Sequence, residues 1–150
     1  MSHPGGGPGK GFRSLGVAFG HRSCEEKSCR PPQAPSARLT DPEVPEWRYA
    51  VPLESHRINR GSGGKGKHKG GDGTIRRVRF LERMQAALVS NRRKVPPFGL
   101  HGGEAGSCGD QWIERADGGS EKLEGRCRAE VGAGDVFAVQ TPSGGGYGKG

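Results

Sequence analysis

Hydrophobic and polar residues alternate over short stretches in the second half of the chain, and this period of two predicts β-strands. The stretch 74–83 places Val78 and Phe80 between arginines, which predicts a strand with one apolar face. The next stretch, 84–94, also fits one face of a helix. Because it is short and follows a strand, we expect a second strand in a hairpin context.

Turn residues divide the remaining sequence into further short strands. Asp117 and Gly118 supply the turn chemistry for a hairpin within residues 112–124. Two more strands are expected at 129–131 and 136–139, joined by a tight turn. The sequence therefore predicts an all-β fold, a small β-meander or sandwich-like segment with long glycine-rich loops.

Residues 39–54 lead into this region and contain three prolines beside aromatic and β-branched residues. This composition predicts an extended strand interrupted at Pro52. The predicted inward-facing positions of the whole sheet are few: Val78, Phe80, Leu88, Val89, Trp112, Ile113, Leu123, Val131, Val136, Phe137 and Val139.

Composition limits how much of the 150-residue chain can form a core. Only 30% of the residues are hydrophobic, and the chain contains 29 glycines and 11 prolines. Residues 1–36 are rich in both and show no apolar periodicity, so we expect a disordered N-terminal arm there and a folded segment over 37–150. The thin core predicts that the chain is a piece of something larger.

Charge adds a candidate partner class. The formal net charge is +8, and residues 57–94 carry twelve basic residues against two acidic ones. This excess predicts an anionic partner: a phosphorylated small molecule, an acidic protein surface or nucleic acid. Basic glycine-rich segments bind single strands mainly with interleaved aromatic residues. Residues 57–73 contain no aromatic residue, which disfavours stacking on RNA bases. A basic non-enzymatic protein that binds RNA or another anionic partner is therefore kept as the alternative function.

The stretch 61–73, GSGGKGKHKGGDG, is the most distinctive candidate site, since seven of its thirteen residues are glycine. Successive backbone N–H groups can cradle an anion, although glycine also permits close backbone packing. The stretch does not match the phosphate-binding pattern GxxxxGK[ST]. Our candidates for substrate or phosphate binding here are Gly61, Gly63, Gly64, Lys65, Gly66 and Lys67.

A few side chains outside this cradle could contribute to a site. His68, His101 and Glu104 lie in or beside glycine-rich loops, where such groups can act as acid or base. Arg92 and Arg93 could clamp a carboxylate or phosphate. No complete catalytic set has interpretable spacing, so the catalytic residues stay unassigned.

Cysteine and hydropathy patterns indicate the compartment. The four cysteines form no CxxC pair, and no zinc site is expected from His21, Cys24 and Cys29 because a fourth ligand is lacking. No apolar run approaches the roughly 18 residues that cross a bilayer. A cytoplasmic protein without a membrane segment is expected.

Several unusual motifs follow one another in a specific order. They are LTDPEVPEWRY, RGSGGKGKHKGGDG, RFLE, SNRRKVPPFGLHGGEAG and GDVFAVQTPSGGGYG. Together they resemble the C-terminal part of the hydantoinase B and ATP-hydrolysing 5-oxoprolinase family over about residues 37–150. Ser143 stands where this family often has glycine.

The resemblance implies a fragment of an enzyme that opens the cyclic amide 5-oxoproline to glutamate with ATP. It implies a hydantoinase A-type subunit or domain as partner, and this partner would carry most of the ATP-binding site. It is compatible with a divalent metal cofactor in the enzyme, but it assigns no metal ligand to this stretch. We therefore expect the chain to be inactive alone.

Overall fold

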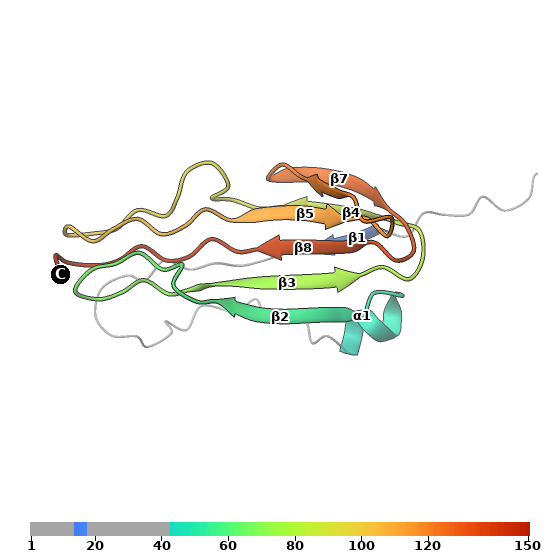
Figure 1. Cartoon of the computed structure of the whole chain (residues 1–150), viewed down its shortest axis with the longest axis horizontal. Helices are drawn as coiled ribbons and strands as arrows, with labels where there is room; N and C mark the ends of the chain where they lie inside the picture. Colours follow the sequence, from blue (N-terminus) through green and yellow to red (C-terminus); the bar gives the residue numbers. More distant parts are fainter. Residues whose placement is uncertain (1–13, 18–42) are drawn as a thin grey trace, which may run out of the picture.

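Two β-sheets make up the described part of the chain, residues 14–17 and 43–150, in a computed structural model (Figure 1). The larger sheet has the strand order β2-β3-β8-β5-β6, and the smaller one has the order β1-β4-β7. The strands of the larger sheet are β2 (Leu53–Asn59), β3 (Gly73–Arg79), β5 (Asp110–Glu114), β6 (Ser120–Lys122) and β8 (Val136–Gln140). Those of the smaller sheet are β1 (Ser14–Val17), β4 (Met84–Val89) and β7 (Arg126–Val131). The all-β prediction is confirmed.

Strand β3 forms where the alternation of Val78 and Phe80 predicts it. It pairs antiparallel with β2 on one side and with β8 on the other, and Val78 lies opposite Phe137. Opposite residues in a sheet point to the same face, so these two side chains share the inner face. The register thus places Val78, Phe137 and Val139 toward the second sheet.

The stretch 84–89 is a strand, as predicted, but it does not form a hairpin with β3. Strand β4 pairs antiparallel with β7 and parallel with β1, in the other sheet. The connection Phe80–Arg83 contains no glycine, asparagine or aspartate for a tight hairpin turn. Instead, the N–H of Phe80 donates to the carbonyl of Asp135, and the chain crosses to the smaller sheet.

The turn at residues 132–135 also connects the two sheets. Gly134 has φ +91°, and the N–H of Gly132 donates to the Asp135 carboxylate at 2.9 Å. The turn is as predicted, but strands β7 and β8 lie in different sheets. The architecture is therefore the sandwich-like alternative, and the simple meander is wrong.

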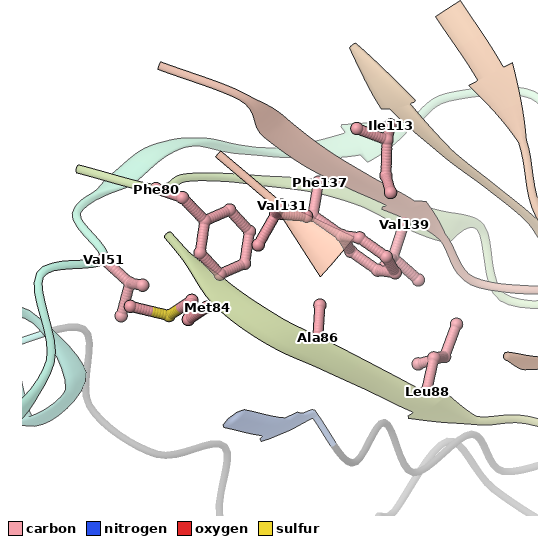
Figure 2. Close-up of a cluster of buried hydrophobic side chains, with 9 residues drawn as sticks. All are labelled: Val51, Phe80, Met84, Ala86, Leu88, Ile113, Val131, Phe137 and Val139. Carbon is pink, nitrogen blue, oxygen red and sulfur yellow. The ribbon is translucent and has the colours of Figure 1, made fainter. Parts of the chain in front are cut away.

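The core lies between the two sheets (Figure 2). Its buried cluster consists of Val51, Phe80, Met84, Ala86, Leu88, Ile113, Val131, Phe137 and Val139.

Most predicted inward positions are buried, but Val89 is 70% exposed. In β4 every second residue points inward, and Met84, Ala86 and Leu88 occupy those positions, so Val89 must point outward. Val78, Trp112 and Leu123 are only half-buried. The sequence prediction missed Val51, Met84 and Ala86, which also belong to the buried cluster.

The predicted extended strand over 39–54 is wrong in its first part. Glu43–Arg48 form the short helix α1, and the strand β2 begins only at Leu53. Proline is tolerated in the first turn of a helix, where the backbone N–H has no intrahelical partner. The Glu46 carboxylate accepts a 2.9 Å hydrogen bond from the Leu53 N–H, which joins the helix to the strand.

Residues 1–13 and 18–42 lie outside the described part. The disordered arm over 1–36 stays a prediction, although Ser14–Val17 within it form β1. The expectation for His21, Cys24 and Cys29 also concerns residues outside the described part. Within the described residues, no helix is long and apolar enough to span a membrane.

Candidate functional site

Three glycine-rich segments lie side by side at one end of the sandwich (Figure 1). Residues 61–73 connect β2 to β3, residues 97–107 precede β5, and residues 142–150 follow β8. We call these three segments the glycine layer. Glycine-rich stretches that are far apart in the sequence therefore converge.

Backbone hydrogen bonds connect each segment of the glycine layer to the other two. The Gly64 N–H donates to the Gly144 carbonyl at 2.9 Å, and the Glu104 N–H donates to the Lys65 carbonyl at 2.7 Å. The third contact is a 2.8 Å hydrogen bond from the Gly146 N–H to the Glu104 carbonyl. The layer is held by main-chain atoms, so its side chains remain available for other contacts.

The close approach of these backbones explains the glycine content. A Cβ atom on Gly64 would lie 2.2 Å from the Glu104 carbonyl oxygen, and one on Gly146 would lie 2.1 Å from that of Lys65. A Cβ on Gly103 would lie 2.3 Å from Gly146. These distances are far below van der Waals contact, so only glycine fits.

The predicted anion cradle uses several of its amides inside the chain. The N–H groups of Gly63, Gly64 and Lys67 donate to Asp72, Gly144 and Gly148 respectively. The geometry gives these three amides a structural role. Gly61 and Gly66 also belong to this layer, and phosphate binding by the predicted set stays a prediction.

Of these three amides, only that of Gly63 holds an anion in the structure, and that anion is the Asp72 carboxylate. The hydrogen bond from the Gly63 N–H is the main reason why the pKa of Asp72 falls to about 2, with Lys69 and the Gly61 amide adding to it. Asp72 thus stays ionised and closes the turn between β2 and β3.

Lys65 and Lys67 project from the glycine layer into solvent. Lys69, in contrast, pairs with Asp72 at 3.0 Å. Within residues 43–150, neither Lys65 nor Lys67 forms an ion pair with a carboxylate. Together with the exposed Lys149 in the third segment, these two lysines are the cations of the layer that can meet an external anion.

His68 and His101 come from different segments and both lie beside Tyr147. The ring centroid of His101 is 4.9 Å from that of Tyr147, and the centroid of His68 is 6.2 Å from it. Glu104 is exposed and joins this group through its backbone bonds to Lys65 and Gly146. The structure brings the predicted acid-base candidates to one layer.

Arg92 and Arg93 have different environments. Arg92 is exposed, has φ +58°, and its guanidinium lies 5.9 Å above the Phe98 ring. Arg93 is half-buried, and it donates to the Ser90 hydroxyl at 2.7 Å and to the Gln140 carbonyl at 2.6 Å. Desolvation lowers the pKa of Arg93. Only Arg93 is held in a fixed position.

A cleft of about 730 Å³ lies beside Arg93, which is within the size range of small-molecule sites. Its walls come from the chain after β4, the start of β5, the β6–β7 connection and the end of β8. Basic side chains outnumber acidic ones on these walls. They are Arg92, Arg93, Lys94, Lys122 and Arg126 against Asp110 and Glu124.

Metal binding finds no support in the described residues, which contain no group of three or more His, Cys, Asp or Glu side chains able to hold a metal.

The sequence prediction missed Tyr147 and Ser143, which join separate segments of the glycine layer. The one available signal was an isolated bulky or hydroxyl residue within an otherwise all-glycine run.

Comparisons with known proteins agree with the motif order. A model of the hydantoinase B/oxoprolinase family matches residues 27–150. The chain is 42% identical over 108 residues to 5-oxoprolinase of Saccharomyces cerevisiae, which covers 71% of this chain and 8% of the yeast protein. It is 39% identical over 114 residues to 5-oxoprolinase 1 of Arabidopsis thaliana, covering 76% and 9% respectively.

A third relative, 5-oxoprolinase of Dictyostelium discoideum, is 34% identical over 114 residues, covering 76% of this chain and 9% of that protein. The chain therefore spans less than a tenth of the length of these three relatives. No solved structure matches the chain.

Proposed function

The chain belongs to the hydantoinase B/oxoprolinase family, and we propose from this that it forms part of an ATP-dependent hydrolase that converts 5-oxo-L-proline to L-glutamate. The observation that carries the proposal is the family match over residues 27–150, together with relatives that are named 5-oxoprolinase. Family membership favours this enzymatic function over the nucleic-acid alternative.

The proposed reaction needs more protein than this chain. Because the chain corresponds to 8% of the yeast relative, we place the nucleotide site in a hydantoinase A-type part, carried by a partner subunit or another region. ATP would activate the amide carbonyl by phosphorylation, and water would then open the ring. The chain's contribution would be to position groups around the reacting molecule.

The glycine layer suits a positioning role. Its segments are fixed by main-chain hydrogen bonds and by contacts that only glycine permits. Side chains on such a frame need little reorganisation when charge develops in a transition state. We assign Lys65 and Lys67 to phosphate or carboxylate oxygens, and His101 with His68 to proton transfer. A cytoplasmic location agrees with this role and stays an expectation.

A reconstitution assay tests the proposal. The purified chain is assayed for 5-oxoproline-dependent ATP hydrolysis alone, and then together with yeast 5-oxoprolinase that lacks the matching segment. We expect no turnover from either component alone and turnover from the mixture. A mixture that forms a complex without any turnover would reduce the chain to a structural element.

A further inference from the structure

We propose that the cleft beside Arg93 binds a small oxyanion, a carboxylate or a phosphate, through the Arg93 guanidinium. This site is separate from the glycine layer and does not depend on the proposed function. Its size suits a small organic acid, and its walls carry five basic and two acidic side chains. A concave, positively charged wall attracts anions and raises their local concentration.

The charge on Arg93 has no carboxylate partner of its own among the described residues. The two hydrogen bonds that it donates go to a hydroxyl and to a carbonyl, on Ser90 and Gln140. A guanidinium has five N–H donors, so three remain. A half-buried cation ordinarily has a counterion, because burial without one is costly.

Asp110 is the acidic residue that acts electrostatically on Arg93, but its carboxylate is engaged elsewhere. One of its oxygens accepts from the Lys122 ammonium at 2.7 Å, and the other accepts from the Gln111 N–H at 2.9 Å. Asp110 therefore neutralises Lys122 at the same wall. An external oxyanion is the natural partner for Arg93.

Two glycines leave the room that the Arg93 side chain needs in this position. A Cβ on Gly109 would lie 2.2 Å from Nη1 of Arg93, and a Cβ on Gly125 would lie 3.0 Å from its Cγ. Any larger residue at Gly109 would displace the guanidinium. A structural role alone explains the bonds to Ser90 and Gln140, but it does not explain the open, basic cleft beside them.

Cys108 lines the same cleft and provides a chemical probe. Iodoacetate carries a carboxylate, whereas iodoacetamide is its neutral analogue. The alkylation rates of Cys108 with both reagents are measured on the full chain by peptide mass spectrometry. N-acetylcysteine under the same conditions gives the reference ratio. We expect the ratio of iodoacetate to iodoacetamide at Cys108 to exceed the reference by about tenfold.

Variants test whether Arg93 causes this preference. Arg93→Gln should lower the ratio most of the way to the reference value, whereas Arg128→Gln should keep it. Arg128 is an exposed residue of β7 that does not line the cleft, so both variants lose one positive charge. Equal ratios in the native chain and in Arg93→Gln would overturn the proposal.

Protection of the native chain tests the site even if Arg93→Gln does not fold. Cyclopentanecarboxylate, at about ten times its Kd, should slow alkylation of Cys108 by iodoacetamide at least about fivefold, and cyclopentanecarboxamide should not. Protection by inorganic phosphate without protection by cyclopentanecarboxylate would identify phosphate as the oxyanion source, and the reverse result would identify an organic carboxylate. Failure of both anions, or equal protection by the amide, would overturn the site.

Discussion

The hydroxyl of Ser143 donates a 2.5 Å hydrogen bond to the backbone carbonyl of Ser62, although the two residues are 81 positions apart in the sequence. The same oxygen accepts a 2.6 Å hydrogen bond from the Ser107 N–H. Ser143 is fully buried. One hydroxyl group therefore connects all three segments of the glycine layer.

Replacing Ser143 by alanine should destabilise the chain. The change leaves the Ser107 N–H and the Ser62 carbonyl without their partner in a buried site, which costs about 1–3 kcal/mol in the free energy of unfolding. Urea unfolding of the native chain and of Ser143→Ala measures this difference. Ser120→Ala, on the exposed strand β6, is the matched control and should change stability by less than about 0.5 kcal/mol. Equal free energies of unfolding for the two variants would contradict the role of the Ser143 hydroxyl in connecting the three segments.

A second prediction concerns the glycine contacts. A Cβ on Gly145 would lie 2.0 Å from the Phe98 carbonyl oxygen, whereas one on Gly71 would meet no atom within 4 Å. Gly145→Ala should therefore lower the free energy of unfolding by about 3 kcal/mol or prevent folding. Gly71→Ala should be neutral or stabilising by up to about 1 kcal/mol. Thermal unfolding measures the stability of both variants. A stability of Gly145→Ala equal to that of the native chain would show that the glycine layer is not tightly packed.

The sequence predicts individual strands better than their partners. The alternation of Val78 and Phe80 identifies β3, and Asp117 with Gly118 identifies the β5–β6 hairpin, because side-chain period and turn chemistry are local properties. The turn at 132–135 is equally local. The assignment of β7 and β8 to different sheets depends on long-range packing, which no local pattern encodes.

The candidate site is harder to predict for the same reason. Glycine has no side chain to set a register, so nothing in residues 61–73 indicates that they pair with 97–107 and 142–150. His68 and His101 could be nominated by residue type alone. Their common neighbour Tyr147 could not, because the three residues meet only through backbone pairing.

The low pKa of Asp72 predicts a pH dependence of stability. The pKa is about 2 in the folded chain, against the ordinary value of 3.8, because the Gly63 amide and Lys69 favour the charged form. The stabilisation is complete above about pH 4 and disappears as the pH falls through 2.

This dependence can be isolated with Asp72→Asn. The difference in the free energy of unfolding between the native chain and Asp72→Asn, measured by urea unfolding, should be constant from pH 5 to 7 and shrink between about pH 4 and 2. A difference that does not vary with pH would show that the carboxylate charge does not stabilise the turn.

A role of His101 in proton transfer predicts a specific kinetic effect. In a reconstituted enzyme, His101→Asn should lower kcat for 5-oxoproline-dependent ATP hydrolysis by about 100-fold or more, with little change in KM. His56→Asn is the matched control, because His56 is an exposed residue of β2 outside the glycine layer. Steady-state kinetics of both variants distinguish the roles, and equal kcat values would remove His101 from the reaction.

A chimeric enzyme tests the central claim most directly, that this chain supplies a working part of a 5-oxoprolinase-type enzyme. The matching segment of yeast 5-oxoprolinase, to which the chain is 42% identical, is replaced by this chain. The purified chimera is then assayed for ATP hydrolysis with and without 5-oxoproline, and the yeast protein without the segment is the control. We predict 5-oxoproline-dependent turnover in the chimera and none in the control. A folded chimera that binds ATP but shows no such turnover would contradict the claim.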